Sequence, residues 1–360
     1  MLATSCLKTT PKVLFRHEGK VTHHIGPVGV RYIIARASQT TAEIRQLDSG
    51  REVAKIAIQG LNCSYDHQER LYCGTQFKKV VCVSSRSFKI LGSISTKGSV
   101  NSLSLGFHPH TLIVGQTNGH IAFLKINGDR LKAAEEAKRQ PSAQSAANRP
   151  PVLQKLHELK LLDANISKVI RTTQDDLALG TSKGVHFYKV NQDFSMAPSC
   201  EAVCLTECDV TELSEFAIDK YVVAAWNSND MLVIDRARPR DAPGILREPL
   251  WCNNLCTDLV PMPDYHPIVF PFYLSKSLRS IKLINFRTMK IFTLIETADM
   301  PTDCYGYKKL TLAKTPDGRL KIVFVTSENQ STIVSEVQFA RNFRKALEVT
   351  GWREYVADDN

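Results

Sequence analysis

The stretch TLIVGQTNGHIAFLKI, residues 111–126, decides how the chain is interpreted, because its two glycines allow two interpretations. A phosphate-binding loop has a strand, a glycine-rich turn and then a helix whose first amides point at the anion. Here apolar runs lie on both sides of Gly115 and Gly119, no helix start follows, and the Lys-Ser or Lys-Thr of a P-loop is missing. An Asn-Gly pair between two apolar runs is typical of a β-hairpin. We therefore predict a turn between two strands rather than a nucleotide site.

The same hairpin pattern recurs along the chain. Each copy has an apolar run, a short polar turn and a second apolar run. The seven copies lie at residues 31–47, 70–85, 111–126, 176–190, 221–236, 268–284 and 321–337. Most of them are spaced by about forty to fifty residues, which is the period of four-stranded propeller blades.

Shorter apolar segments flank the copies and complete four strands per unit. Residues 99–107 precede the third copy, for example, and residues 51–59 follow the first. The segment KVLFRH, residues 12–17, is a further strand ahead of the first copy, whereas the last copy lacks an outer strand. Pairing these two would close a ring and remove an exposed sheet edge. The sequence therefore predicts an all-β fold, a seven-bladed β-propeller of four-stranded antiparallel blades that is closed by residues 12–17.

The repeated units resemble degenerate WD repeats. The resemblance is carried by the central strand-turn-strand, as in IVGQTNGHIAFLKI at residues 113–126 and LALGTSKGVHFYKV at residues 177–190, and it covers nearly the whole chain. It implies a rigid ring whose faces bind peptides or other protein domains within a larger complex. We expect a scaffold that binds protein partners and has no catalytic activity.

The domain organisation follows from the repeats. We expect a propeller over residues 1–345, which contains a flexible insertion at residues 127–152, and a C-terminal tail at residues 346–360. The first half of the insertion is rich in helix formers, and the second half, PSAQSAANRPP, has the composition of a linker. Disorder is the expected state of the insertion, and docking of a partner is the alternative.

Deleting residues 131–151 should leave the melting temperature nearly unchanged, because the entropy of loop closure depends only weakly on loop length. Thermal melts of the full chain and of the deletion variant, followed by circular dichroism, check this. A large drop in the melting temperature would mean that the insertion packs into the fold.

The sequence shows no motif of catalysis or of membrane insertion. Gly-x-Ser-x-Gly, His-Glu-x-x-His and a Walker lysine are missing, so no enzyme is predicted. No run of eighteen apolar residues occurs, and Lys8 and Lys12 interrupt the N-terminal segment, which lacks the apolar core of a signal peptide. We expect a protein of the cytoplasm, with the nucleus as the alternative.

The ten cysteines raise the question of a metal site. Cys200, Cys204 and Cys208 are spaced by four, and Cys252 and Cys256 repeat that spacing. Zinc sites usually pair cysteines at closer spacing on a turn, whereas a spacing of four in a strand places side chains on one face. We therefore predict buried structural thiols, no metal and no cofactor.

The formal net charge of +10 requires positive surface, which attracts acidic partners. If the turns inside the copies share a face with the links between blades, lysine is enriched there. The links add Lys20, Lys97 and Lys168. The predicted partner-binding residues are Lys78, Lys79, Lys183, Lys276, Arg279 and Trp226. A solvated face of mixed charge is the alternative.

Two other kinds of partner remain open at this point. A phosphoinositide-binding propeller is suggested by Asn285-Phe286-Arg287-Thr288, which partly resembles the Phe-Arg-Arg-Gly motif of such proteins but has one arginine and no glycine. An RNA-associated propeller is suggested by the net charge alone. The basic connection RARPRDAPGILR, residues 236–247, is a further segment that could contact phosphates.

Overall fold

The computed structural model describes most of the chain between residues 11 and 339. The described residues are 11–18, 25–28, 32–36, 38, 40–47, 49–67, 70–108, 110–128, 151–205, 209–226, 231–246, 259–261, 272–276, 280–285, 290–296, 307–314, 320–328 and 331–339. Residues 129–150 of the predicted insertion and the predicted tail at residues 346–360 lie outside them.

The described strands form seven sheets, which we number as blades in chain order. Blade 1 contains β2 (Ile25–Val28), β3 (Tyr32–Arg36), β4 (Ala42–Gln46) and β5 (Glu52–Ile56), and blade 2 contains β6 (Leu61–His67), β7 (Arg70–Thr75), β8 (Lys79–Ser84) and β9 (Ile90–Ser95). Blade 3 contains β10 (Val100–Leu105), β11 (Thr111–Gln116), β12 (His120–Ile126) and β13 (Leu153–Lys160).

The second half of the ring repeats this order. Blade 4 contains β14 (Ile166–Arg171), β15 (Leu177–Thr181), β16 (Gly184–Val190), β17 (Met196–Pro198) and β18 (Val203–Cys204), and blade 5 contains β19 (Asp209–Ala217), β20 (Lys220–Trp226), β21 (Met231–Asp235) and β22 (Gly244–Leu246). Blade 6 contains β23 (Leu259–Pro261), β24 (Phe272–Lys276), β25 (Ser280–Asn285) and β26 (Lys290–Glu296). Blade 7 contains β27 (Tyr307–Lys314), β28 (Leu320–Glu328), β29 (Ser331–Gln338) and β1 (Lys12–Glu18).

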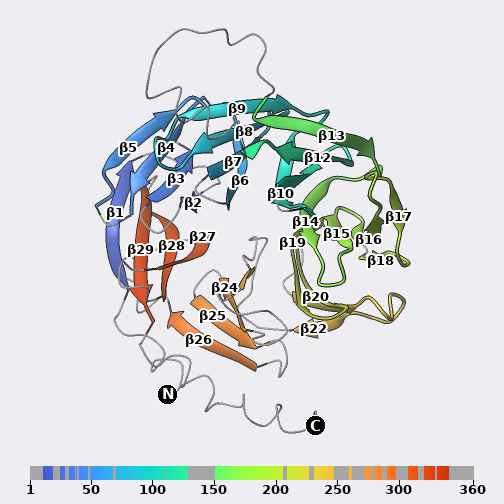
Figure 1. The fold of residues 1–360 in the computed structure, drawn as a ribbon. Coiled ribbons are helices and arrows are strands. Elements are labelled where there is room, and N and C mark those ends of the chain that lie inside the picture. The colour runs from blue at the N-terminus through green and yellow to red at the C-terminus, as the bar shows by residue number, and fades with distance from the viewer. Residues whose placement is uncertain are drawn as a thin grey trace.

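The blades are arranged in a ring (Figure 1). The first strand of each blade contacts the first strand of the next, from β2 through β6, β10, β14, β19 and β23 to β27, and β27 contacts β2. This arrangement confirms the predicted all-β propeller, and the seven described sheets agree with the predicted number of blades. The predicted hairpin copies are the second and third strands of the blades.

The hairpin at residues 111–126 shows why its second glycine is needed. Gly119 has a φ of +74°, a conformation that L side chains rarely adopt. A Cβ at this position would lie 1.8 Å from the carbonyl oxygen of Leu162, and the Leu161 amide donates to the Gly119 carbonyl at 3.0 Å. The glycine thus allows the turn to approach the link to blade 4, as the hairpin interpretation predicted.

The ring is closed by β1, as the sequence predicted. β1 pairs antiparallel with β29, from Lys12 opposite Glu336 to Glu18 opposite Ser331. The ring of Phe15 packs against Gly50 of blade 1, where a Cβ would lie 2.4 Å from it. The N-terminal strand therefore completes the last blade and also contacts the first.

The hydrophobic core lies between neighbouring blades. One cluster joins Tyr72 and Val80 of blade 2 to Leu112 and Leu124 of blade 3. Comparable clusters join blades 1 and 2, 3 and 4, and 4 and 5. Because the described clusters bury the apolar faces of a blade against its neighbours, the stability of each of these blades depends on the integrity of the ring.

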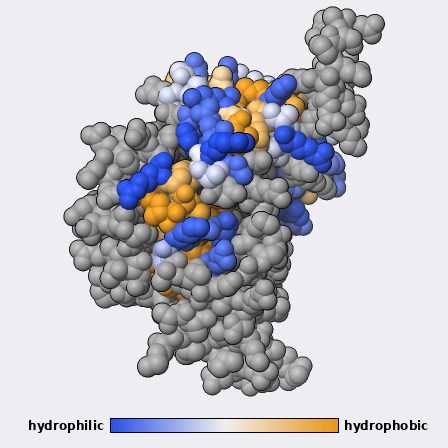
Figure 2. Space-filling view, turned by 90° about the vertical axis from the view of Figure 1, so that its left-hand side faces the viewer, coloured by the Kyte–Doolittle hydropathy of each residue, from blue (hydrophilic) through white to orange (hydrophobic). Residues whose placement is uncertain are grey.

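The outer surface of the ring mixes polar and apolar side chains. Figure 2 shows the side on which β1 and β5 lie, where hydrophilic groups surround smaller hydrophobic areas. In the described part of the chain, the exposed large hydrophobic residues are Val53, Phe77 and Ile218. The same part contains no helix that is long and apolar enough to span a membrane.

Candidate functional site

Backbone hydrogen bonds show that the hairpin turns and the links between blades share one face of the ring. In blade 2 the Gln76 amide donates to the Gly60 carbonyl at 2.8 Å, and the Thr96 amide donates to the Lys78 carbonyl at 2.8 Å. Equivalent bonds tie the turn of blade 3 to Ser99 and the turn of blade 4 to Asn165. We call this the hairpin face. The far face carries the turns between first and second strands.

Four lysines lie exposed on the hairpin face. Lys78 and Lys79 are in the turn of blade 2, Lys97 is in the link that follows blade 2, and Lys183 is in the turn of blade 4. Among the described residues, none of the four ammonium groups forms an ion pair. Near Lys183, the carboxylate of Asp163 is already paired with Lys160 at 2.5 Å, and this contact lowers the pKa of Asp163.

The structure describes the side chains of only some of the other residues that the sequence assigned to this face. Lys168, expected in a link, lies within β14, and its ammonium group pairs with Glu212 at 2.5 Å. Lys276 and Trp226 are the last residues of β24 and β20, and their side chains lie outside the description. Lys20 and Arg279 also lie outside the described residues.

Phe77 is a feature of this face that the sequence reasoning missed. Its side chain is 54% exposed, although its ring packs on Gly60, where a Cβ would lie 2.8 Å from it. The turn around it is fixed, because the Lys79 amide donates to the Thr75 hydroxyl at 3.1 Å, and that hydroxyl donates back to the Lys79 carbonyl. The available signal was an apolar residue at a turn position that holds polar residues in the neighbouring copies.

The carboxylate of Glu158 lies next to Lys97 and is already bound by other groups. The carboxylate of Glu158 accepts from the Lys155 ammonium group at 2.5 Å, from Gln116 at 2.9 Å and from the Lys97 amide at 2.9 Å. Burial raises the pKa of Glu158, but these hydrogen bonds together outweigh burial and lower it. Among the described residues, Lys78, Lys79 and Lys97 form no ion pair with a carboxylate, so their side chains make this corner positively charged.

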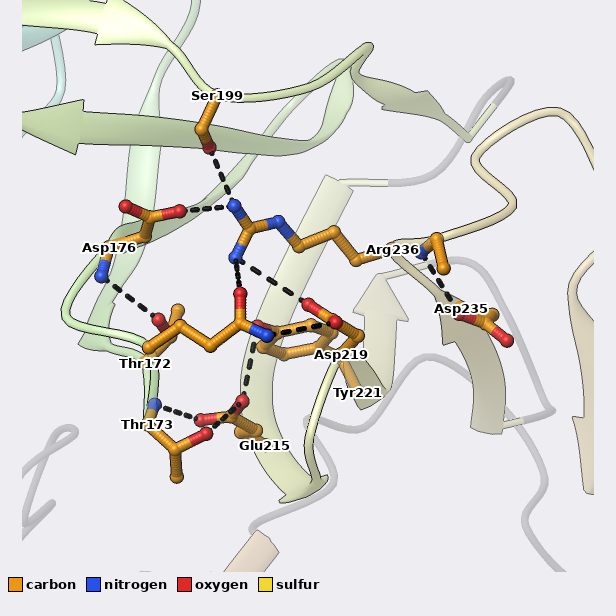
Figure 3. A network of polar contacts seen from close by, with 11 residues as sticks. Thr172, Thr173, Asp176, Ser199, Glu215, Asp219, Tyr221, Asp235 and Arg236 are labelled. Carbon is orange, nitrogen blue, oxygen red and sulfur yellow. Dashed lines mark hydrogen bonds and ion pairs between the residues drawn. The ribbon is translucent and has the colours of Figure 1, made fainter.

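The far face carries a buried ion cluster between blades 4 and 5 (Figure 3). Arg236, which follows β21, donates to the carboxylate of Asp176 and to the hydroxyl of Ser199, and its guanidinium group lies 3.6 Å from Asp219. The side chains of Arg236 and Asp176 are only 10% and 11% exposed. The guanidinium group also lies over the ring of Phe187, 5.4 Å from its centroid. This arrangement links the two blades by charge as well as by packing.

The cluster continues through a third carboxyl group, that of Glu215. Glu215 accepts from the Thr173 amide at 2.6 Å, from the Thr173 hydroxyl at 2.9 Å and from the Tyr221 hydroxyl at 3.3 Å. Burial raises the pKa of both Glu215 and Tyr221. Burial also raises the pKa of the Cys200 thiol, although Arg236 is adjacent, and this disfavours the thiolate form that acts as a nucleophile. We therefore interpret the cluster as structural.

The arginine-rich connection does not offer free cations in its described part. Arg236 pairs with Asp176, Arg238 pairs with Asp241 at 3.8 Å, and Arg240 pairs with Glu201 at 2.8 Å. In the described chain, no group of three or more candidate metal ligands is found. The hairpin face, where described lysines are exposed and form no ion pair, is therefore the better candidate for a binding site.

Comparison with known proteins finds a match in structure but none in sequence. No protein-family model and no curated protein sequence matches the chain. The crystal structure of RRP9 WD40 repeats superimposes on it with a TM-score of 0.61 and 11% sequence identity, over 93% of this chain and 99% of that chain. A likeness at this identity shows the fold alone. The chain therefore has the fold of a WD-repeat β-propeller.

Proposed function

We propose that the chain is a non-catalytic interaction scaffold whose hairpin face binds an acidic segment of a partner protein. The proposal rests on Lys78, Lys79, Lys97 and Lys183, which are exposed there and form no ion pair within the described residues. Each exposed charge contact contributes at most about 1 kcal/mol. Recognition therefore depends on several lysines, which blade 2, the link that follows it and blade 4 bring to one face.

Three further predicted contacts belong to the same proposal. Lys276, Arg279 and Trp226 fall in the corresponding hairpins of blades 5 and 6 and would extend the binding surface around the ring. We also propose that residues 1–345 act as one propeller within a larger complex, in the cytoplasm or the nucleus. Residues 127–152 would then form an insertion, and residues 346–360 a tail.

The hypotheses of lipid and RNA binding have less support. The segment Phe286-Arg287-Thr288, on which the lipid hypothesis depends, lies outside the described residues. The RNA hypothesis depends on net charge, and the described arginines of residues 236–240 are paired with carboxylates. A protein segment is the partner that the hairpin face favours.

Copurification from cell extract separates the three classes of partner. The tagged full chain is captured with and without nuclease treatment, and the bound proteins, RNA and lipids are identified. We expect proteins with acidic segments to remain bound after nuclease treatment and to be released at about 0.5 M salt, because salt screens exposed charges. Recovery of RNA or anionic lipid as the main bound material would contradict the proposal.

A further inference from the structure

We propose that the blade 2 turn anchors one large apolar side chain of the acidic segment on Phe77, while Lys78, Lys79 and Lys97 bind carboxylates on either side. This inference rests on the proposed function, because it specifies how the hairpin face recognises its partner. The complementary ligand is a protein segment in which an apolar residue is flanked by Asp or Glu.

The apolar part of the site is Phe77. Of the exposed large hydrophobic residues in the described chain, Phe77 lies on the hairpin face, Val53 lies on the outer strand β5, and Ile218 lies in a far-face turn. Covering the exposed part of an aromatic ring removes apolar surface from water, which is the main favourable contribution to most protein association. An apolar side chain of the partner that covers the Phe77 ring would therefore stabilise the complex.

The turn that carries Phe77 is held on both sides. The Gln76 amide donates to Gly60, the Ser99 hydroxyl donates to the Gln76 carbonyl at 2.6 Å, and the Thr96 amide donates to the Lys78 carbonyl. Lys78 has a φ of 57°, a left-handed conformation that is uncommon for a lysine. A site fixed in this way loses little conformational entropy on binding.

Three lysines lie near Phe77 in the fold. Lys78 and Lys79 follow Phe77 directly, and the hydrogen bond from Thr96 to Lys78 brings the adjacent Lys97 to the same corner. Glu158, which also reaches this corner, is 4% exposed at its side chain and is occupied by Lys155 and Gln116. Positive and apolar chemistry thus lie side by side, and an acidic segment with one apolar residue matches both.

A random dodecapeptide library displayed on phage, selected on the folded full chain, provides the probe. The affinities of enriched peptides are then measured by fluorescence anisotropy for the wild type and four variants. These are Phe77→Ser, the conservative Phe77→Leu, the double variant Lys78→Glu with Lys97→Glu, and Ile218→Ser. Ile218 is the matched control, because it is also 54% exposed but lies on the far face. Circular dichroism verifies that each variant is folded.

We expect the enriched peptides to carry one large apolar residue flanked by acids. Phe77→Ser should weaken their binding at least tenfold, Phe77→Leu should weaken it less, Ile218→Ser should leave it unchanged, and the double lysine variant should abolish it. Replacing the apolar residue of the peptide by alanine should weaken binding to the wild type but not to Phe77→Ser, as expected for two groups in contact.

Two results would contradict the inference, and they have different consequences for the proposed function. If the peptides depend on Lys78 and Lys97 but bind Phe77→Ser as well as the wild type, the face binds acids without an apolar anchor, and only the inference fails. If no enriched peptide responds to the lysine reversals, the proposed function fails together with it.

Discussion

A chain that lacks residues 1–18 should no longer fold into a stable ring. Six residues of β1 pair with β29, and each backbone hydrogen bond in such a ladder contributes about 0.5–1.5 kcal/mol. Packing of the half-buried Val13, Leu14 and Phe15 is lost as well. The combined loss is several kcal/mol, which is comparable to the roughly 5–15 kcal/mol that stabilises a typical domain.

The exposed edge of β29 adds a second consequence. Without β1 its unpaired backbone groups become a template for pairing with another chain, so we expect aggregation. Size-exclusion chromatography and thermal melts of the truncated and full chains measure both effects. A truncated chain that elutes and melts like the full chain would contradict the closure of the ring by β1.

A circular permutant serves as the control for this truncation. Residues 1–18, joined through a flexible linker behind residue 360, supply the same strand from the other end of the chain. The antiparallel register places Lys12 opposite Glu336, so a strand that enters after β29 has the required direction. The permutant should recover the elution volume and the melting temperature of the full chain, because it restores the pairing with β29.

Replacing Arg236 by methionine should strongly destabilise the fold. It leaves the carboxylate of Asp176, whose side chain is 11% exposed, without its guanidinium partner, and it removes the hydrogen bond to Ser199. Breaking a buried ion pair in this way destabilises a protein by about 3–5 kcal/mol. Urea denaturation at neutral pH measures the free energy of unfolding of the variant and of the wild type.

Two control variants test whether the loss of stability comes from the buried ion pair. Arg240→Met removes an arginine of the same connection whose side chain is 84% exposed beside Glu201, and it should leave the denaturation midpoint unchanged. The double variant Arg236→Met with Asp176→Leu removes both charges and should recover part of the stability, since an apolar pair often replaces a buried ion pair. An Arg236→Met variant as stable as the Arg240→Met variant would show that the cluster does not hold blades 4 and 5 together.

The fold could be predicted from the sequence because its evidence is local and repeated. The turn between Gly115 and Gly119 is encoded within sixteen residues, and the same pattern recurs in every blade. The closing role of residues 12–17 followed from a simple count of strands, in which one was spare at the start and one was missing at the end. A missing edge strand is a strong constraint, because exposed sheet edges are unfavourable.

The side-chain partners could not be predicted in the same way, because they are distant in sequence. Arg236 and Asp176 are 60 residues apart, and Lys168 and Glu212 are 44 apart, so only the closed ring brings each pair together. The sequence showed arginines and lysines as surface cations, whereas the structure pairs several of them with carboxylates. The packing of the exposed Phe77 ring likewise depends on Gly60, which belongs to the preceding link.

The claim that the hairpin face binds acidic protein segments is tested most directly by two matched charge reversals. The first changes Lys79, Lys97 and Lys183 of the hairpin face to Glu. The control changes Lys89, Lys125 and Lys189 to Glu. These lysines are also exposed, but they lie near the far face of the ring. Both variants have the same net charge, so only the position of the charge differs.

Capture of partner proteins from nuclease-treated extract is measured for the wild type and both variants, with circular dichroism as the folding control. We predict that the control variant keeps its partners and that the hairpin-face variant loses them. Retention of every partner by the hairpin-face variant, or equal loss by both, would contradict the account, because the hairpin-face lysines would then have no specific role in binding.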